Sequence, residues 1–147
     1  PPAAPCRRQR RKLRGFPILP TGFRFVMPPS VIHFSDPAPE PVEDRPALGR
    51  AIGSPPLRLT AERYAAEDGA LSIGDWACEP GAWRIAFHPG RHEFFQVVSG
   101  RLRIVDTAGN AREFGPGEAG IIPAGFIGTF EVIERVEKRY VMLDRAG

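Results

Sequence analysis

The sequence predicts an all-β sandwich or barrel, and three observations support this fold class. Glycines interrupt the second half of the chain at short intervals, the segments between them are rich in β-branched and aromatic residues, and no amphipathic helix of useful length competes with them. Short strands separated by turn residues at that spacing are typical of a sandwich or barrel. A chain of 147 residues is long enough for one domain with a real core and too short for two ordinary ones.

The expected strands follow one another with turn residues between them. Glu67-Asp68-Gly69 predicts a turn that joins the first two strands into a hairpin, and 106–110 predicts a second hairpin loop in which Gly109 adopts a positive φ. The expected strands are 57–64, 70–78, 83–88, 93–99, 102–107, 111–114, 120–123, 129–133 and 137–143.

The N-terminal part differs in composition from this region. Eight prolines between Pro28 and Pro56 exclude a helix or a central strand, so residues 27–56 are expected to be an extended lead-in to a domain at 57–147. Residues 1–26 carry seven Lys or Arg and no acid, and we expect a disordered or non-native extension. Met27 opens an ordinary protein beginning and is the expected natural start.

The charge distribution argues against nucleic acid as a partner. The net charge is +3, but after subtraction of the arm 20 − 7 = 13 bases remain against 17 acids, which leaves the body at about −4. No apolar run approaches the roughly 20 residues of a membrane span. Cys6 and Cys78 form neither a zinc spacing nor a disulfide framework, and Cys78 is expected to be a buried, inert thiol. We expect a soluble cytoplasmic protein.

Residues 93–98 show how this strand meets its neighbours. Glu93, Phe95 and Val97 share one face, and the opposite face carries two further apolar residues, Phe94 and Val98. A sheet with one face in water alternates more cleanly, so we expect the outer face to pack on the lead-in or on a second subunit. A homodimer is the expected assembly.

Glu93 and Gly100 are separated by six residues, and four residues separate His88 from Glu93. This spacing resembles the first motif of the cupins, in which Gly, five residues and His-X-His precede a gap of three or four residues, Glu, six residues and Gly. The two histidine positions of that motif fall at Ala86 and His88.

The second cupin motif, Gly, five residues, Pro-X-Gly, two residues, His, three residues and Asn, is matched at Gly117, Pro123 and Gly125. Its histidine position is Gly128 and its asparagine position is Val132. Over residues 57–143 the chain most resembles the single-domain cupins grouped with ureidoglycine aminohydrolase, which also include ethanolamine-utilisation proteins. Further residues that carry this likeness lie at 74–83, 93–94, 114–118 and 122–132.

The resemblance implies an RmlC-like jelly-roll β-sandwich, or double-stranded β-helix. It also implies a barrel site at which imidazoles and a carboxylate hold a divalent transition metal such as Mn, Fe, Ni or Zn. Here Ala86 and Gly128 lack a donor, and only His88 and Glu93 remain as weak metal ligands. We therefore expect no bound metal or other cofactor, with a divalent metal as the alternative.

Glu93 is expected on the inner face, where burial calls for a compensating cation. Arg84 and Lys138 are the two candidates for that cation. The expected substrate pocket consists of Trp76, Arg84, Glu93, Phe95, Phe130, Lys138 and Tyr140.

Two classes of function fit this pattern. One is a metal-free cupin that binds a small molecule, in small nitrogen-compound metabolism by the family resemblance. The other is an enzyme, either a metal-dependent hydrolase resembling ureidoglycine aminohydrolase or a metal-independent, isomerase-like protein that uses His88 and Glu93 as acid and base. The residues leave this choice open, because a fold does not decide a function.

Overall fold

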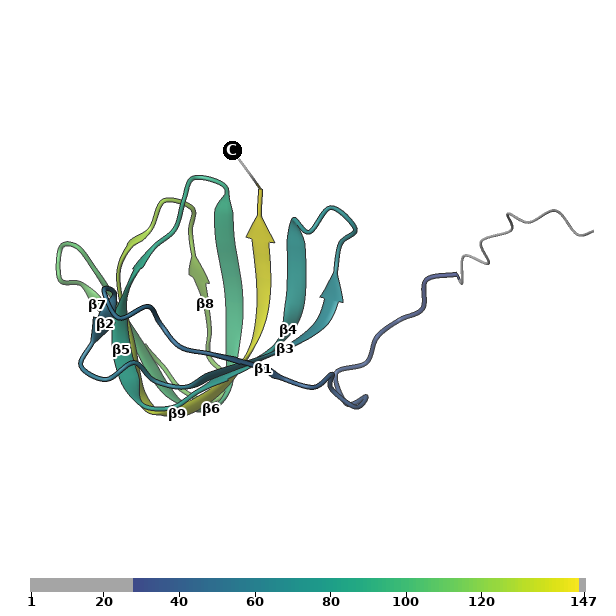
Figure 1. The fold of residues 1–147 in the computed structure, drawn as a ribbon, viewed down its shortest axis with the longest axis horizontal. Helices are drawn as coiled ribbons and strands as arrows, with labels where there is room; N and C mark the ends of the chain where they lie inside the picture. The colour runs from purple at the N-terminus through teal and green to yellow at the C-terminus, as the bar shows by residue number, and fades with distance from the viewer. Residues whose placement is uncertain (1–27, 146–147) are drawn as a thin grey trace, which may run out of the picture. The chain divides into compact units, whose positions relative to one another are not determined.

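The computed structural model describes residues 28–145, and all of its strands lie in the unit Ile32–Gly147. Within the described residues the chain has no helix, so there is none that could cross a membrane. The basic arm, the expected start at Met27 and Cys6 lie outside this range. The all-β prediction is confirmed (Figure 1).

Nine strands follow one another in the described part of the chain. They are β1 (Val42–Asp44), β2 (Ala51–Ile52), β3 (Arg58–Ala65), β4 (Leu71–Cys78), β5 (Gly81–Ala86), β6 (Arg91–Asp106), β7 (Ala111–Phe114), β8 (Ala119–Ile122) and β9 (Ile127–Asp144).

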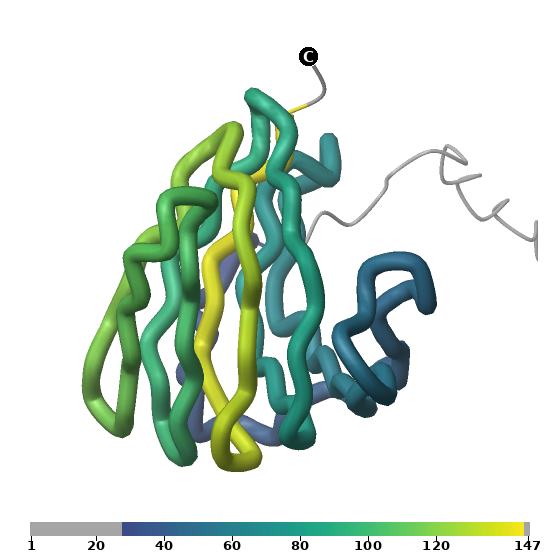
Figure 2. The backbone as a smooth tube through the Cα atoms, turned by 90° about the vertical axis from the view of Figure 1, so that its left-hand side faces the viewer, coloured from purple at the N-terminus to yellow at the C-terminus, as the bar shows by residue number. Residues whose placement is uncertain are grey.

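The strands are paired in antiparallel fashion into a single curled sheet with the order β1-β3-β4-β9-β5-β2, and β6 joins this path through β9. One edge of β9 pairs with β5 and then with β4, while the other edge pairs with β6 along nearly its whole length. β6 in turn pairs with β7 and β8. Figures 1 and 2 show that the sheet curls round on itself.

The inner surface of this curl carries the core. Buried apolar residues alternate with exposed ones along β5, β6 and β9, as the period of two predicts for a strand with one buried face. The core cluster comprises Cys78, Trp83, Ile85, Phe95, Val97, Leu102, Ile104, Ile122, Phe130, Val132 and Val136.

The two predicted hairpins are confirmed. β3 and β4 pair across the turn at 66–70, and β6 and β7 pair across the loop that Asp106 organises. The Asp106 carboxylate accepts hydrogen bonds from the backbone N–H groups of Ala108 and Asn110, and Gly109 has a φ of +86°.

Strand length is where the prediction was wrong. The segments 93–99 and 102–107 fall in one sixteen-residue strand, β6, which ends at Asp106. The segments 129–133 and 137–143 are parts of β9. Gly100 does not end β6, because the register with β9 shifts at bulges between Val97 and Leu102 and pairing then resumes. The glycine therefore marks a bend within a strand rather than a turn between two strands.

The proline-rich lead-in contributes directly to the sheet. Its strands β1 and β2 lie at the two ends of the pairing order β1-β3-β4-β9-β5-β2. This agrees with the expectation that the proline-rich segment forms no central strand. The Phe34 ring lies 5.0 Å from the Arg63 guanidinium and 4.9 Å from that of Arg139, measured to the ring centroid. The lead-in leaves Phe94 and Val98 on the outer face 46% and 48% exposed. It therefore does not provide the expected cover for them, and the homodimer stays a prediction.

Substitution of two glycines with positive φ, Gly100 and Gly109, tests how closely β6 approaches β9. A Cβ at Gly100 would lie 2.0 Å from the carbonyl oxygen of Arg135, whereas one at Gly109 would meet nothing within 4 Å. Gly109→Ala should cost about 1 kcal/mol for the backbone conformation alone. Gly100→Ala should cost about 1–3 kcal/mol more, since the strands must also move apart. Urea unfolding of both variants measures the difference, and equal losses would contradict the close packing.

Candidate functional site

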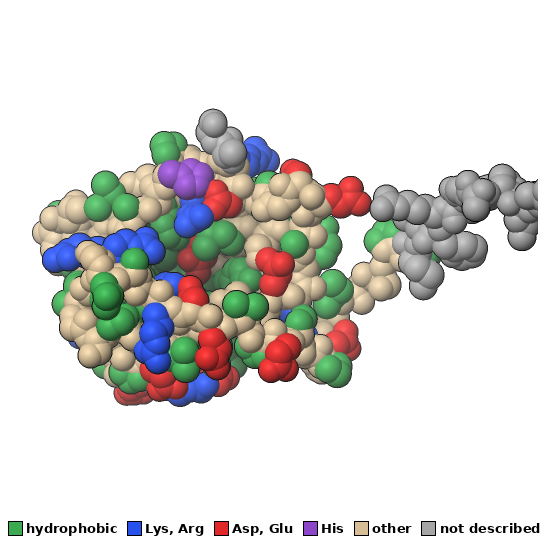
Figure 3. All heavy atoms as spheres, viewed as in Figure 1, with side chains coloured by type: hydrophobic (Ala, Val, Ile, Leu, Met, Phe, Trp, Pro, Cys, Tyr) green, Lys and Arg blue, Asp and Glu red, His purple; other side chains and the backbone are tan. Residues whose placement is uncertain are grey.

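A cavity of about 380 Å³ opens into the inside of the curled sheet. Figure 3 shows the hollow on the face seen in Figure 1, with acidic and basic side chains inside it. This volume lies within the range of about 300–1,000 Å³ that is usual for small-molecule sites. The lining residues are Asp44, Arg50, Arg58, Thr60, Glu62, Ser72, Trp76, Trp83, Ile85, Ala86, Phe87, Arg91, Glu93, Ile122, Phe130, Lys138, Tyr140 and Met142.

Strand alternation explains why these side chains converge. Positions 58, 60 and 62 of β3, 83 and 85 of β5, 91 and 93 of β6, and 138, 140 and 142 of β9 each share one face of their strand and all line the cavity. Together with Ser72 and Trp76 of β4 and Ile122 of β8, these four strands supply one site.

The polar centre of the cavity is an ion pair between Lys138 and Glu93. The Lys138 ammonium donates to Oε1 of Glu93, and the two residues are only 4% and 7% exposed. Two charges buried this deeply are tolerated only when they neutralise each other and are hydrogen-bonded. Lys138, and not Arg84, is thus the cation that compensates Glu93.

Aromatic rings enclose the same ammonium group. Nζ of Lys138 lies 4.6 Å from the ring centroid of Trp76, and 5.0 Å from the centroids of both Phe95 and Phe130. Ring faces attract a desolvated cation, which adds to the attraction of Glu93. Trp83 stacks on Phe130 at a centroid distance of 4.9 Å and continues this aromatic wall.

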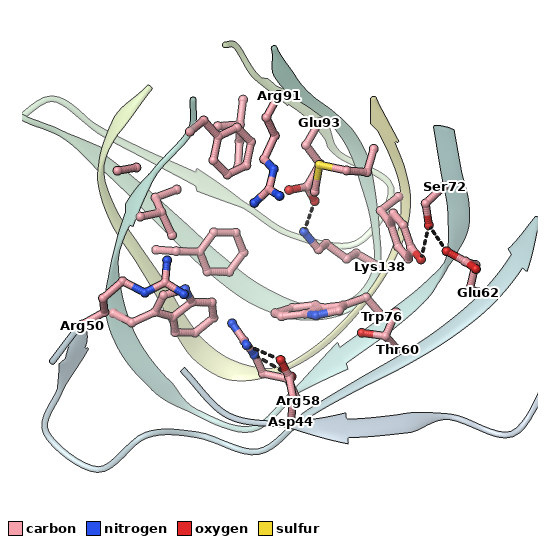
Figure 4. Close-up of a pocket in the computed structure, with 18 residues that line it drawn as sticks. Asp44, Arg50, Arg58, Thr60, Glu62, Ser72, Trp76, Arg91, Glu93 and Lys138 are labelled. Carbon is pink, nitrogen blue, oxygen red and sulfur yellow. Dashed lines mark hydrogen bonds and ion pairs between the residues drawn. The ribbon is translucent and has the colours of Figure 1, made fainter. Parts of the chain in front are cut away.

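A second polar group lies beside this pair (Figure 4). The Ser72 hydroxyl donates to Oε2 of Glu62 at 2.5 Å and lies 3.0 Å from the Tyr140 hydroxyl. Burial raises the pKa of Tyr140 above its ordinary value, against the opposing effect of the Ser72 hydrogen bond. The phenol is therefore protonated at neutral pH and can donate a hydrogen bond.

Two arginines in the cavity are held by carboxylates. Arg58 donates through Nε and Nη2 to the two oxygens of Asp44, and its guanidinium lies 5.5 Å from the Trp83 ring centroid. Arg91 donates through Nε, at 2.8 Å, and through Nη2 to the same oxygen of Asp144. The hydrogen bond from Arg91, assisted by one from His88, holds the pKa of Asp144 below its ordinary value despite some desolvation.

The predicted pocket residues are distributed between three places. Arg84 is exposed on β5, on the opposite face from Trp83, and does not line this cavity. Phe95 is fully buried in the core beneath the Lys138 ammonium and does not line the cavity either. The residues that the structure does bring together there are Trp76, Glu93, Phe130, Lys138 and Tyr140.

His88 lies away from Glu93. It follows β5, is exposed, and its Nε2 is 2.5 Å from Oδ1 of Asp144. It is not part of the cavity lining, so the structure does not bring together the acid and base of the isomerase-like alternative.

Sequence reasoning missed the charged groups of the lead-in and of β3. The alternation of β3 was available as a signal for Arg58 and Glu62, and the alternation of β6 was available for Arg91, which shares a face with Glu93. The sequence held no comparable signal for Asp44 and Arg50, because their place depends on how the lead-in crosses the sheet edges.

The residues present do not fit a cupin metal centre. Within residues 28–145 no three His, Cys, Asp or Glu side chains lie close enough to hold a metal ion. At one histidine position of the motif, Gly128, a Cβ would lie 2.2 Å from the carbonyl oxygen of Val105. The backbone there leaves no room for any side chain, so this position could not accept a histidine without rearrangement.

The two remaining metal-ligand candidates are engaged elsewhere. Glu93 is paired with Lys138 and His88 with Asp144. Ala86 lines the cavity but has no donor atom. A cation beside Glu93 would also face the Lys138 ammonium, whose like charge opposes it.

Comparison with known proteins supports the fold. Residues 65–140 match the family described as the EutQ-like cupin domain. No curated protein sequence matches the chain.

Among solved structures, the Clostridium difficile EutQ protein aligns with a TM-score of 0.54 at 21% identity, over 60% of this chain and 64% of that one. A Pseudomonas syringae protein of unknown function aligns with a TM-score of 0.62 at 18% identity, over 69% and 43%. A candidate ethanolamine utilization protein Q from Salmonella typhimurium aligns with a TM-score of 0.54 at 15% identity, over 73% and 98%. This chain spans less than two thirds of the first protein and under half of the second.

The buried ion pair gives a stability prediction. Lys138→Met should cost about 3–5 kcal/mol, because it leaves the Glu93 carboxylate buried without a cation. The double variant Lys138→Met/Glu93→Leu should recover most of that loss, since no unpaired charge remains. Urea unfolding measures both.

A matched control for the ion pair is Arg135→Met, which breaks the exposed pairs with Glu79 and Glu137 and should change stability little. The single variant Glu93→Leu is measured as well. If the double variant lost as much stability as Lys138→Met and Glu93→Leu summed, the buried pair would not be the source of the effect.

Cys78 gives a prediction of reactivity. The residue is 2% exposed, and burial raises the pKa of its thiol to about 12, so almost no thiolate is present at neutral pH. In a Cys6→Ser protein, which has Cys78 as its single thiol, Ellman's reagent should react about 100-fold more slowly in buffer than in urea. Comparable rates in the two conditions would show that the thiol is accessible.

Proposed function

Because this chain belongs to the EutQ-like cupin family, we propose that it binds a small molecule in the cavity around Glu93 and Lys138 without a metal ion. The observation that carries the proposal is the Lys138 ammonium itself. It is held by Glu93 and by three aromatic rings, and it occupies the position from which the Glu93 carboxylate could otherwise coordinate a metal ion.

The cavity offers a ligand both apolar and polar contacts. Trp76, Phe130 and Met142 supply apolar surface, while the Tyr140 hydroxyl and the charged side chains supply hydrogen bonds. A few fixed polar groups in a largely apolar concave surface are typical of small-molecule sites. We further propose that the ligand belongs to small nitrogen-compound metabolism. The EutQ-like description of the family and the ethanolamine-utilisation description of the Salmonella protein support this assignment.

The enzyme alternatives have less support from the site. A metal-dependent hydrolase would need ligands at Ala86 and Gly128, which carry no donor atoms, and Gly128 has no space for a side chain. An isomerase-like mechanism with His88 and Glu93 would need both groups in the cavity, and His88 is outside it.

Elemental analysis tests the metal-free part of the proposal. The full chain, purified without chelator and then equilibrated with Mn²⁺, Ni²⁺ or Zn²⁺ and desalted, should retain less than about a tenth of an equivalent of any of these metals. Retention near one equivalent, abolished by Glu93→Gln, would overturn the proposal and favour the hydrolase. His33→Ala serves as the control, since His33 lies in the lead-in away from the cavity.

A further inference from the structure

The charged side chains around the cavity are unequal in number. Four cationic residues line it, together with three carboxylates. Each carboxylate already has a partner, because Asp44 binds Arg58, Glu93 binds Lys138, and Glu62 accepts from the Ser72 hydroxyl. The cations of this lining are Arg50, Arg58, Arg91 and Lys138.

Within residues 28–145, Arg50 is the cation of this lining that no carboxylate neutralises, and it is exposed. Its side chain makes no ion pair or hydrogen bond with any described residue from 28 to 145. Its backbone, in contrast, is fixed directly before β2. The N–H of Arg50 donates to the carbonyl of Ala47 at 2.8 Å, and its own carbonyl accepts from the N–H of Arg84 at 2.9 Å. Figure 4 shows the guanidinium of Arg50 directed into the cavity.

Arg91 reaches the cavity from another strand. Its Nε and Nη2 bind Asp144, which does not itself line the cavity, and Nη1 keeps its donors. Figure 4 shows this guanidinium pointing into the same space, near Glu93. Arg50, directly before β2, and Arg91, on β6, therefore offer unused N–H donors. A planar guanidinium suits an oxyanion with two or more oxygens.

A cationic ligand is disfavoured by the same arrangement. The aromatic rings that would attract a cation are already occupied by the Lys138 ammonium. Of the carboxylates that could bind a cation, Asp44 is neutralised by Arg58 and Glu93 by Lys138. Glu62 keeps its charge, but it is hydrogen-bonded to Ser72 on the opposite side of the cavity from Arg50 (Figure 4).

Taken with the proposed function, on which this step rests, we infer that the cavity takes a small organic anion. Its oxyanion, a carboxylate or a phosphate, binds Arg50 and the free edge of Arg91. Its carbon skeleton lies against Trp76 and Phe130. The lead-in, through Arg50, thus determines which ligands the barrel accepts.

The chain provides its own reporter for this site. It has two tryptophans, Trp76 and Trp83, and both line the cavity, so all tryptophan emission comes from there. The probes are phenylacetate, its neutral analogue phenylacetamide, its cationic analogue phenethylamine, and phenyl phosphate. Each is titrated into the full chain at constant ionic strength while tryptophan fluorescence is recorded. The excitation wavelength is at the long-wavelength edge of the tryptophan absorption band.

An anion should change the emission at concentrations at least about fivefold lower than the amide, and the amine should bind most weakly. Arg50→Gln should remove this preference, leaving acid and amide about equal. The matched control is Arg112→Gln, which removes one positive charge from an exposed residue that lies outside the cavity lining. Comparison of phenylacetate with phenyl phosphate distinguishes the two oxyanions.

The outcomes separate the two claims. If the amide binds as tightly as the acid, or if Arg112→Gln lowers anion affinity as much as Arg50→Gln, the anion site is wrong while cavity binding stands. If none of the four probes changes the emission at any concentration up to its solubility limit, both the anion site and the proposed function are overturned.

Discussion

The buried pair of Glu93 and Lys138 is the constraint on which the rest of this site depends. Both charges lie inside the curl, on the two strands that run side by side for most of their length, β6 and β9. Removing either group from water is expensive unless the partner and the surrounding dipoles replace the lost hydration. The aromatic rings around the ammonium add to the attraction of Glu93, and the pairing of β6 with β9 brings the two side chains to the same inner face. The ion pair in turn fixes the positions of the Glu93 and Lys138 side chains in the cavity wall.

This arrangement changes what a cupin barrel can do in this chain. The carboxylate that the motif would give to a metal is used by a lysine, and the strand that would carry a histidine passes so close to its neighbour at Gly128 that no side chain fits. The cavity keeps its volume and its aromatic wall but presents ammonium, guanidinium and hydroxyl donors. Part of this polarity comes from the lead-in, because Asp44 on β1 and Arg50 directly before β2 both line the cavity.

Sequence reasoning identified the features that depend on local periodicity. The all-β class, the two hairpins and the inward face of residues 93–97 follow from alternation and turn residues, which are local properties. The continuity of β6 through Gly100 was missed, because a glycine with positive φ serves a bulge as well as a turn. In the site, five of the expected pocket residues line the cavity. The choice of Lys138 over Arg84, and the arrival of Arg50, depend on long-range pairing that no local pattern encodes.

The most direct test of this account is to locate metal and lysine in the same crystal. Crystals of the full chain grown with excess Mn²⁺, Ni²⁺ or Zn²⁺, with data collected at the absorption edge of that metal, give an anomalous map that shows metal positions independently of the protein density. A metal-free ion pair should give no anomalous peak beside Glu93 and clear density for Nζ of Lys138 hydrogen-bonded to the Glu93 carboxylate. An anomalous peak at Glu93, with the Lys138 side chain turned away from it, would show that the carboxylate binds metal instead of the lysine.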